Sequence, residues 1–465
     1  MKQWYQIYKP ELADTIRLSI PIVIAQLGVV LMGVTDNLFV GRLLGAVPLA
    51  GAGLSVSLTF LVSSIGVGGL SVIAALVSQA NGRGDTAEIN RLFRAGLRVA
   101  LLLGLVLGLL GAGLAHFFGL FGQTLEVTEI GRNFMLILSA SNIPLFLFIA
   151  ARQLCDGLAH PRVAMSITLS ALVLNALFNY LLITGVGPFP EWGVYGSAVA
   201  TLLSRLYMAA AIILYIRRAD RFRRYFQPVF RAFAVGVHVR KILRLGLPGG
   251  FTYFFEAATF SLAAMMAGWL GADQLAAHQI AINMASTTYM MATGISSAGA
   301  IRVGNALGRS SQASVRRAGV AALWLVTAFM GFMALIFFTA NDWLVSLYIR
   351  DNAPVATLAA SLVIMGGFFQ LSDGVQVVGV GILRGISDVN VPTIITLFAY
   401  WIVGLPLSYI VGFGLNLGAA GIWIGLLAGL TMAAILLPIR FFRLLRRMKP
   451  DGVENQFLNE KTVPK

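Results

Sequence analysis

Three acidic residues lie deep inside apolar stretches of this sequence: Asp36, Glu256 and Asp373. An ionised acid at the centre of a membrane-embedded helix costs roughly 2.5–3.5 kcal/mol on insertion scales. Acids that persist in such places usually face an internal cavity and mark a path for ions or protons. The type and position of these residues therefore predict the binding of a mobile positive species.

Polar residues accompany the acids at helical spacing. Gln370, Asp373 and Gln376 are three residues apart, so they share one side of a helix. The other polar stripes comprise Thr252, Glu256 and Thr259; Asn175 and Asn179; and Gln279, Asn283 and Ser286, followed by Met290 and Thr293. A stripe of this kind favours an aqueous or ion-lined surface. For any single Ser, Thr or Asn the alternative stays open: an interhelical hydrogen bond worth about 0.6 kcal/mol.

The surrounding composition is that of a membrane protein. Of 465 residues, 58% are hydrophobic and 11% charged, against about a quarter charged in soluble proteins. Apolar runs of about 20 residues, enough to cross a hydrocarbon core of roughly 30 Å, recur along the chain. We therefore predict an all-α integral membrane protein with twelve spans, near 15–40, 48–77, 93–118, 130–153, 163–186, 193–216, 244–271, 275–303, 315–340, 357–381, 391–413 and 418–442.

Charge placement predicts the topology. The start of the chain lacks the pattern of a cleaved signal peptide, so the first span is expected to stay in the mature protein. Basic residues gather in alternate connections, in the link around residues 217–241 and near the end of the chain. Because basic loops stay in the cytoplasm, both termini are predicted to be cytoplasmic. The same bias accounts for the net charge of +15 without a nucleic-acid partner.

The sequence is internally duplicated. "IRLSIPIVIAQ" resembles "LRLGLPGGFTY", which places Pro21 over Pro248 at an offset of 227 residues. We predict an N-terminal six-helix bundle (1–216), a basic cytoplasmic linker (217–241), a C-terminal six-helix bundle (242–445) and a cytoplasmic tail (446–465). Because each bundle has an even number of spans, the repeats are parallel, and in transporters such repeats enclose a substrate site.

The acids do not follow the duplication. At the local offset, Glu256 falls on Val29, Asp373 on Leu145, and Asp36 on the small residues around Ala263. A carboxylate that the scaffold required would tend to occur in both copies. Each acid is present in one copy only, which indicates a function for it.

Other chemistry finds no support in the sequence. There is no phosphate-binding loop, the four histidines are scattered, and the single cysteine, Cys155, cannot form a disulfide or a metal-binding cysteine cluster within the chain. We expect a protein that is not an enzyme and needs no cofactor.

These residues resemble the multidrug and toxic compound extrusion (MATE) family, and its NorM-type branch in particular. The likeness covers about residues 12–445 and is carried by "GVTDNLFVGRLLGAVPLAG", "AAHQIAINM" and "PEWGVYGSAVAT", with Glu256 and Asp373 at the acids that mark this branch. The resemblance implies two homologous six-helix bundles in a bacterial inner membrane. It also implies an antiporter, functioning as a monomer, that exports organic and mostly cationic drugs by alternating access against a Na⁺ or H⁺ gradient.

The resemblance also implies roles for individual residues. Glu256 and Asp373 would bind the coupling cation, Na⁺ if it is a metal, and Tyr289 would offer its ring to that cation. Asp36, Asn175 and Asn179 would form a site for a proton or substrate. The substrate cavity would be lined by Gln279 and Asn283 and walled by Met290, Met291, Phe255 and Phe369; for these last four residues, packing or lipid contact is the equal alternative.

Two alternatives from other classes remain. A flippase for lipid-linked sugars, from the same superfamily, would need basic residues inside the spans to bind pyrophosphate, whereas the acids stand out here. A channel or membrane-embedded enzyme would need a pore or a catalytic constellation that the sequence does not suggest. Drug transport in everted vesicles, with and without an ion gradient, separates these classes.

Overall fold

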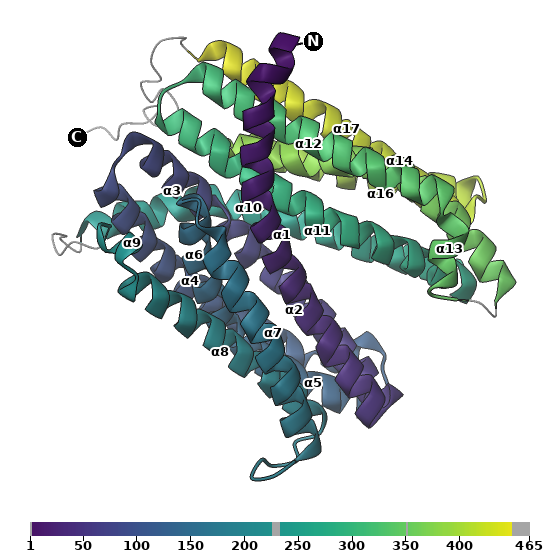
Figure 1. Ribbon diagram of the computed structural model, residues 1–465. Coiled ribbons are helices and arrows are strands. Elements are labelled where there is room, and N and C mark those ends of the chain that lie inside the picture. Colours follow the sequence, from purple (N-terminus) through teal and green to yellow (C-terminus); the bar gives the residue numbers. More distant parts are fainter. Residues whose placement is uncertain (1, 226–232, 350–351, 449–465) are drawn as a thin grey trace, which may run out of the picture. The chain divides into compact units, whose positions relative to one another are not determined.

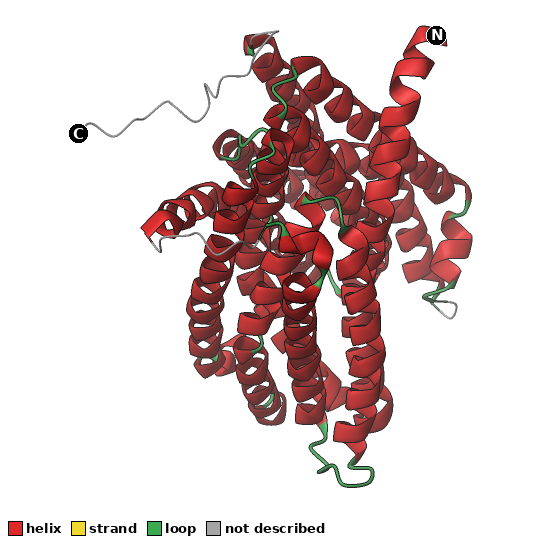
Figure 2. Ribbon diagram, turned by 60° about the vertical axis from the view of Figure 1, so that its left-hand side comes forward, coloured by secondary structure: helices red, strands yellow, loops and turns green. Residues whose placement is uncertain are grey.

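Helices make up nearly all of the part of the chain that the structure describes. The computed structural model describes residues 2–225, 233–349 and 352–448, and these ranges contain no strand (Figure 2). The predicted tail (446–465) therefore lies mostly outside the described residues, as does part of the predicted linker (217–241). The all-α fold class is confirmed.

The helices follow one another with short connections. In the first part of the chain they are α1 (Lys2–Leu44), α2 (Ala46–Leu70), α3 (Val72–Arg83), α4 (Thr86–His116), the 3₁₀ turn η1 (Phe118–Phe121), α5 (Leu125–Ala140), α6 (Asn142–Gly157), α7 (Pro161–Thr184), α8 (Val194–Arg218) and α9 (Asp220–Arg223). The remaining elements are α10 (Phe233–Trp269), α11 (Ala272–Gly308), α12 (Gln312–Thr339), α13 (Asn341–Ser346), α14 (Ala353–Gly385), α15 (Asn390–Leu397), η2 (Phe398–Gly404), α16 (Leu405–Tyr409), η3 (Ile410–Gly414) and α17 (Gly418–Arg447).

The long helices coincide with the predicted spans. Ten helical segments of the described chain are long and apolar enough to cross a membrane, with α2–α3, α5–α6 and α15–η3 each counted as one segment. The other two predicted spans, 244–271 and 275–303, lie in α10 and α11, which are 37 residues each. Polar residues such as Glu256 and Asn283 lower the hydropathy of these two helices.

Three spans depart from a regular α-helix. The second and fourth are interrupted at Ser71 and Ser141, whose hydroxyls donate to the carbonyls three residues earlier, at 2.5 Å and 2.6 Å. Near the second of these breaks, Pro144 has no N–H to continue the helical bonding. The span 390–414 contains two π-helical segments, η2 and η3, on either side of Pro406. Wide turns of this type frequently occur at functional sites.

The helices are grouped into two compact units. Unit 1 consists of Met1–Val23 and Phe255–Lys465, and unit 2 of Ile24–Phe254. Each unit therefore takes one end of α1 and one end of α10, two long helices that both contain a proline, Pro21 and Pro248 respectively. The predicted domain boundaries are drawn at other residues and stay a prediction.

Small residues allow close packing inside each unit. In unit 1, α11, α12 and α17 all pack on α14 (Figure 1), and Ser296 of α11 donates to the Val377 carbonyl of α14 at 2.6 Å. In unit 2, α4 packs on α6 so closely that a Cβ at Gly104 would lie 2.8 Å from Ile143 at the start of α6. Glycine at such contacts lets helix backbones approach closely, as is usual in membranes.

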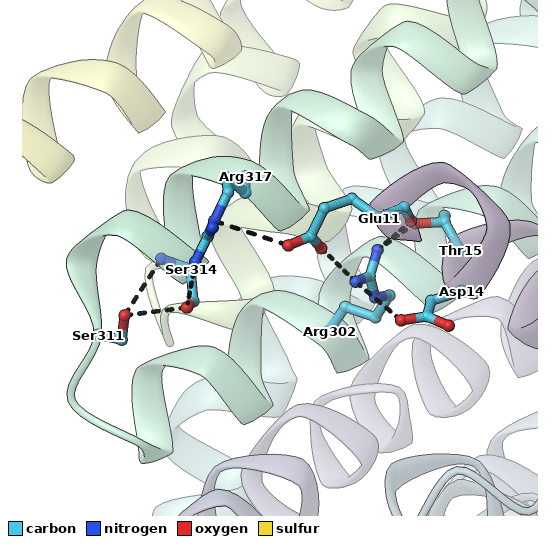
Figure 3. Close-up of polar contacts among 7 residues, drawn as sticks. All are labelled: Glu11, Asp14, Thr15, Arg302, Ser311, Ser314 and Arg317. Carbon is cyan, nitrogen blue, oxygen red and sulfur yellow. Dashed lines mark hydrogen bonds and ion pairs between the residues drawn. The ribbon is translucent and has the colours of Figure 1, made fainter. Parts of the chain in front are cut away.

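The start of α1 is held on unit 1 by an ionic cluster (Figure 3). Arg302 of α11 forms a salt bridge and a main-chain hydrogen bond with Glu11 and donates to Thr15 Oγ1 at 2.6 Å. Arg317 of α12 lies 3.7 Å from Glu11, and Asp14 lies 3.7 Å from Arg302. Glu11 thus bridges two arginines, with its side chain only 18% exposed.

Replacing Glu11 by Ala is expected to destabilise the protein by about 1–3 kcal/mol, because a charged hydrogen bond is lost and Arg302 keeps only weaker partners. The measurement is thermal unfolding of the purified protein. Asp14→Ala is the matched control, since its side chain is 67% exposed and its carboxylate lies at 3.7 Å from Arg302. Equal melting temperatures for the two variants would contradict the bridging role of Glu11.

Candidate functional site

Asp36 of α1 is enclosed by neutral hydrogen-bond donors in unit 2. Its Oδ1 accepts from the side-chain amides of Asn175 at 3.0 Å and Asn179 at 2.6 Å, and its Oδ2 accepts from the Thr201 hydroxyl at 2.6 Å. All three contacts donate to the carboxylate, which is the pattern that stabilises an ionised acid. The structure therefore brings together the three residues predicted for this site.

The helices explain the arrangement. Asn175 and Asn179 lie one turn apart on α7, with both side chains fully buried, and α7 packs on α8, which carries Thr201. The Oδ1 atoms of both asparagines have no hydrogen-bond partner among the described residues. Two unpaired amide oxygens beside a carboxylate form a surface that accepts hydrogen bonds from a protonated group or binds a cation.

Arg205 places a positive charge near Asp36, and it is not among the residues predicted for this site. It lies one turn beyond Thr201 on α8, donates to Ser141 Oγ at 2.6 Å, and interacts electrostatically with Asp36. None of the salt bridges within 4 Å among the described residues joins the two. Only acids were noted inside the spans from the sequence, and Arg205 shows that the span 193–216 also holds a basic residue. The signal was an arginine near the middle of the predicted span 193–216.

Unit 1 holds the other two acids, close to each other. Glu256 of α10 is 7% exposed and Asp373 of α14 is 2% exposed, and their charges repel. The side chain of Tyr289 on α11 is hydrogen-bonded to Glu256. The predicted cation-binding residues therefore lie together, and Tyr289 contributes a hydroxyl contact to the acid.

Several oxygens of this cluster lack partners. Glu256 Oε1, Asp373 Oδ1, Gln376 Oε1 and the Tyr400 hydroxyl are buried without a hydrogen bond in the described chain. Buried polar atoms are usually paired, because an unpaired one costs about 1–3 kcal/mol. Three of these four atoms can only accept hydrogen bonds if the acids are ionised, so the cluster is suited to a cation.

The polar residues of the stripe on α14 have two different roles. Gln370 exchanges hydrogen bonds with Thr288 of α11, at 2.7 Å and 2.9 Å, and so joins two helices. Asp373 and Gln376 of the same stripe keep unpaired oxygens. Spacing alone could not separate the residue that links helices from those with free acceptors.

The predicted cavity residues have different surroundings. Gln279 and Asn283 are exposed on α11, and Met290 is half-buried. Phe369 is buried, with its ring centroid 6.0 Å from Phe260 and 5.6 Å from Trp423. Their part in a substrate cavity stays a prediction.

Comparison with known proteins identifies the family. The MatE family model matches residues 21–181 and 248–410. The two matches begin at Pro21 and Pro248, which is the offset of 227 residues that the internal duplication gave. The chain belongs to the MatE family.

Curated MatE relatives match along nearly the whole chain. A probable multidrug resistance protein NorM of Rhizobium meliloti (strain 1021) is 37% identical over 442 residues, covering 93% of both chains. A protein of the same description from Rhodopseudomonas palustris is 36% identical over 449 residues, covering 94% of this chain and 93% of the relative. The predicted resemblance to the NorM-type branch is confirmed.

Solved MatE structures share the fold. The crystal structure of the eukaryotic MATE transporter AtDTX14 matches with a TM-score of 0.86 at 18% identity, covering 95% of this chain and 99% of the other. A MATE crystal structure in the bent conformation matches with a TM-score of 0.82 at 19% identity, covering 95% and 97%. These two likenesses concern the fold; the family match, the NorM relatives and the ten membrane-length helical segments of the described chain show a multi-pass membrane protein of the MatE transporter family.

Replacing Thr201 by Val is expected to destabilise this MatE protein by about 1–3 kcal/mol, because a methyl group would replace the donor to Asp36 Oδ2. Ser204→Ala is the matched control: Ser204 is a buried residue of the same helix α8, but its hydroxyl bonds only to the Ala200 carbonyl of that helix. Thermal unfolding of both variants provides the measurement. A Thr201→Val protein as stable as the control would show that the Asp36 contact contributes nothing.

Proposed function

We propose that this protein is a cation-coupled antiporter that exports organic, mostly cationic and amphipathic compounds from the cytoplasm, driven by a Na⁺ or H⁺ gradient. The family and the relatives described as multidrug resistance proteins support the class of activity. The observation that carries the proposal is the pair Glu256 and Asp373, two neighbouring buried acids with unpaired oxygens and no salt bridge in the described chain.

The cation site would work by charge neutralisation. Two ionised carboxylates close together in a low-dielectric interior repel each other strongly, so binding of Na⁺ or a proton between them is favoured. When no ion is bound, the hydrogen bond from Tyr289 stabilises the ionised form of Glu256. The carboxylate oxygens of Glu256 and Asp373 are ligands of the type that a hard cation such as Na⁺ requires.

Transport would then follow an alternating-access cycle. In the outward-facing state the carboxylates take up the coupling ion, which removes the attraction for a cationic drug and so releases it. The loaded protein turns inward, and a new drug from the cytoplasm or inner leaflet displaces the ion. Exchange requires that ion and drug compete for the same negative charge, because a ligand without differential affinity cannot shift the equilibrium.

The Asp36 cluster would provide the second polar site. Asp36, Asn175 and Asn179 offer a carboxylate and two unpaired amide oxygens to a proton or to the cationic group of a substrate. Arg205 offsets the charge of Asp36, so this site attracts a cation less strongly than the site with two acids.

Gln279, Asn283, Met290 and Phe369 would line the substrate cavity. Flexible Met side chains suit binding of many unrelated compounds. We further propose that the protein acts as a monomer in a bacterial inner membrane, with both termini in the cytoplasm, as the basic connections favour. No resident cofactor is needed for this cycle.

A flippase for lipid-linked sugars has less support. Such a protein binds pyrophosphate, which requires several basic side chains in the substrate site. Arg205 is one such residue, but it donates to Ser141 and lies within electrostatic reach of Asp36. The cluster around Glu256 and Asp373 would repel a pyrophosphate.

The decisive experiment is ethidium transport by the purified protein in liposomes under an imposed Na⁺ or H⁺ gradient. We expect Glu256→Gln and Asp373→Asn each to reduce ion-driven transport at least about tenfold, since each removes a charge that binds the ion. Asp342→Asn is the matched control, because Asp342 is an exposed acid of the same unit.

Ethidium transport by the unmodified protein that follows neither gradient would refute coupling. Full coupled activity in Asp373→Asn would remove that residue from the ion site. The control variant is expected to retain the rate of the unmodified protein.

A further inference from the structure

Tyr400 lies in the π-helical segment η2 and is fully buried against α10 and its neighbours. Its ring centroid is 6.4 Å from that of Phe260 on α10. The next residue, Trp401, donates from its indole nitrogen to the Phe255 carbonyl at 3.2 Å, with ring centroids 5.9 Å apart. The segment η2 is thus fixed on the part of α10 that contains Glu256.

Through Phe260, Tyr400 is connected to the parts of α10 and α14 that carry the two acids. Phe260 lies one turn after Glu256 on α10, so the two side chains share a side of the helix. Phe260 also contacts Phe369, at 6.0 Å between centroids, and Phe369 lies one turn before Asp373 on α14. Tyr400 therefore packs beside the two helix surfaces that carry the acids. It interacts electrostatically with both carboxylates.

The hydroxyl of Tyr400 has no hydrogen-bond partner in the described chain. A buried tyrosine hydroxyl is normally paired. The two acids that act on it electrostatically also keep unpaired oxygens, Glu256 Oε1 and Asp373 Oδ1. A proton attaches to a single oxygen, so a third oxygen beside two carboxylates is not required for binding a proton. A metal cation that has lost its water shell needs several oxygen ligands.

We propose that the Tyr400 hydroxyl is an oxygen ligand for the coupling cation held by Glu256 and Asp373, and that it makes this site prefer a sodium ion to a proton. The inference rests on the proposed antiport function and extends it. Gln376, whose unpaired Oε1 lies on the same side of α14 as Asp373, is placed to add a fourth oxygen.

The test is Tyr400→Phe, which keeps the aromatic ring and removes only the hydroxyl. In liposomes, ethidium transport is measured as a function of sodium concentration at constant pH, and separately under a pH gradient without sodium. We expect the sodium concentration for half-maximal transport to rise about tenfold, the effect of losing one hydrogen-bond-strength contact to a charge. Proton-driven transport is expected to stay unchanged.

Tyr409→Phe is the matched control, because Tyr409 belongs to the same span but is 55% exposed and stacks on Phe413 at 5.1 Å. A second readout is the rise in melting temperature that sodium produces in the purified protein, which we expect to be lost in Tyr400→Phe and kept in the control. This readout does not depend on transport.

Unchanged half-maximal sodium in Tyr400→Phe would overturn the inference. An equal loss of sodium-driven and proton-driven transport would also overturn it, since that pattern indicates damaged packing. If the unmodified protein responds to protons but not to sodium, the inference fails while the antiport function stands. If it responds to neither ion, the proposed function itself fails.

Discussion

A carboxylate inside a membrane is stable only when donors or positive charge compensate for the water it has lost. This chain meets that requirement in two different ways. In unit 2, Asp36 receives three neutral donors and has Arg205 within electrostatic reach. In unit 1, Tyr289 compensates one of two acids, and oxygens of both acids remain unpaired. The second arrangement leaves acceptor oxygens that a cation could bind, which is why we propose that the coupling ion binds there.

The contrast is notable because the scaffold of the two halves is the same. The family model matches twice, and the duplication extends to single backbone angles: Ala159 and Ser387, at the ends of α6 and α14, both adopt a positive φ, 60° and 63°. Such angles are uncommon for residues other than glycine, so the shared value reflects a shared turn. The two halves thus share a family match and a turn, whereas the buried acids differ between them.

Most of the fold was predictable because hydrophobic length and repeat offset are properties of the sequence itself. Each of the twelve predicted spans coincides, apart from a residue or two at some ends, with a long helix or a run of consecutive helical elements. The breaks at Ser71 and Ser141 and the π segments were not predicted, because they depend on local hydrogen bonding that average hydropathy does not report.

For the site, helical spacing was enough to pair Asn175 with Asn179. The family resemblance was needed to group that pair with Asp36 and to group Glu256 with Asp373. Thr201, Arg205 and Tyr400 were missed. Each comes from a helix distant in sequence, and only tertiary packing brings it to the acids. An arginine inside a predicted span was a signal that could have identified Arg205. Tyr400 gave no comparable signal, because aromatic residues, including thirty phenylalanines, are common in this chain.

The two helices divided between units have a consequence for any attempt to dissect this protein. A fragment ending in the link after α9 would contain all of unit 2 up to that point but also residues 2–23, which pack with unit 1 through Glu11 and Thr15. The complementary fragment would begin with the part of α10 that belongs to unit 2. Neither piece would be a self-contained half. Reassembly from separately expressed fragments would require each fragment to contribute one helix end to the unit formed mainly by the other, an exchange of the kind seen in domain-swapped proteins.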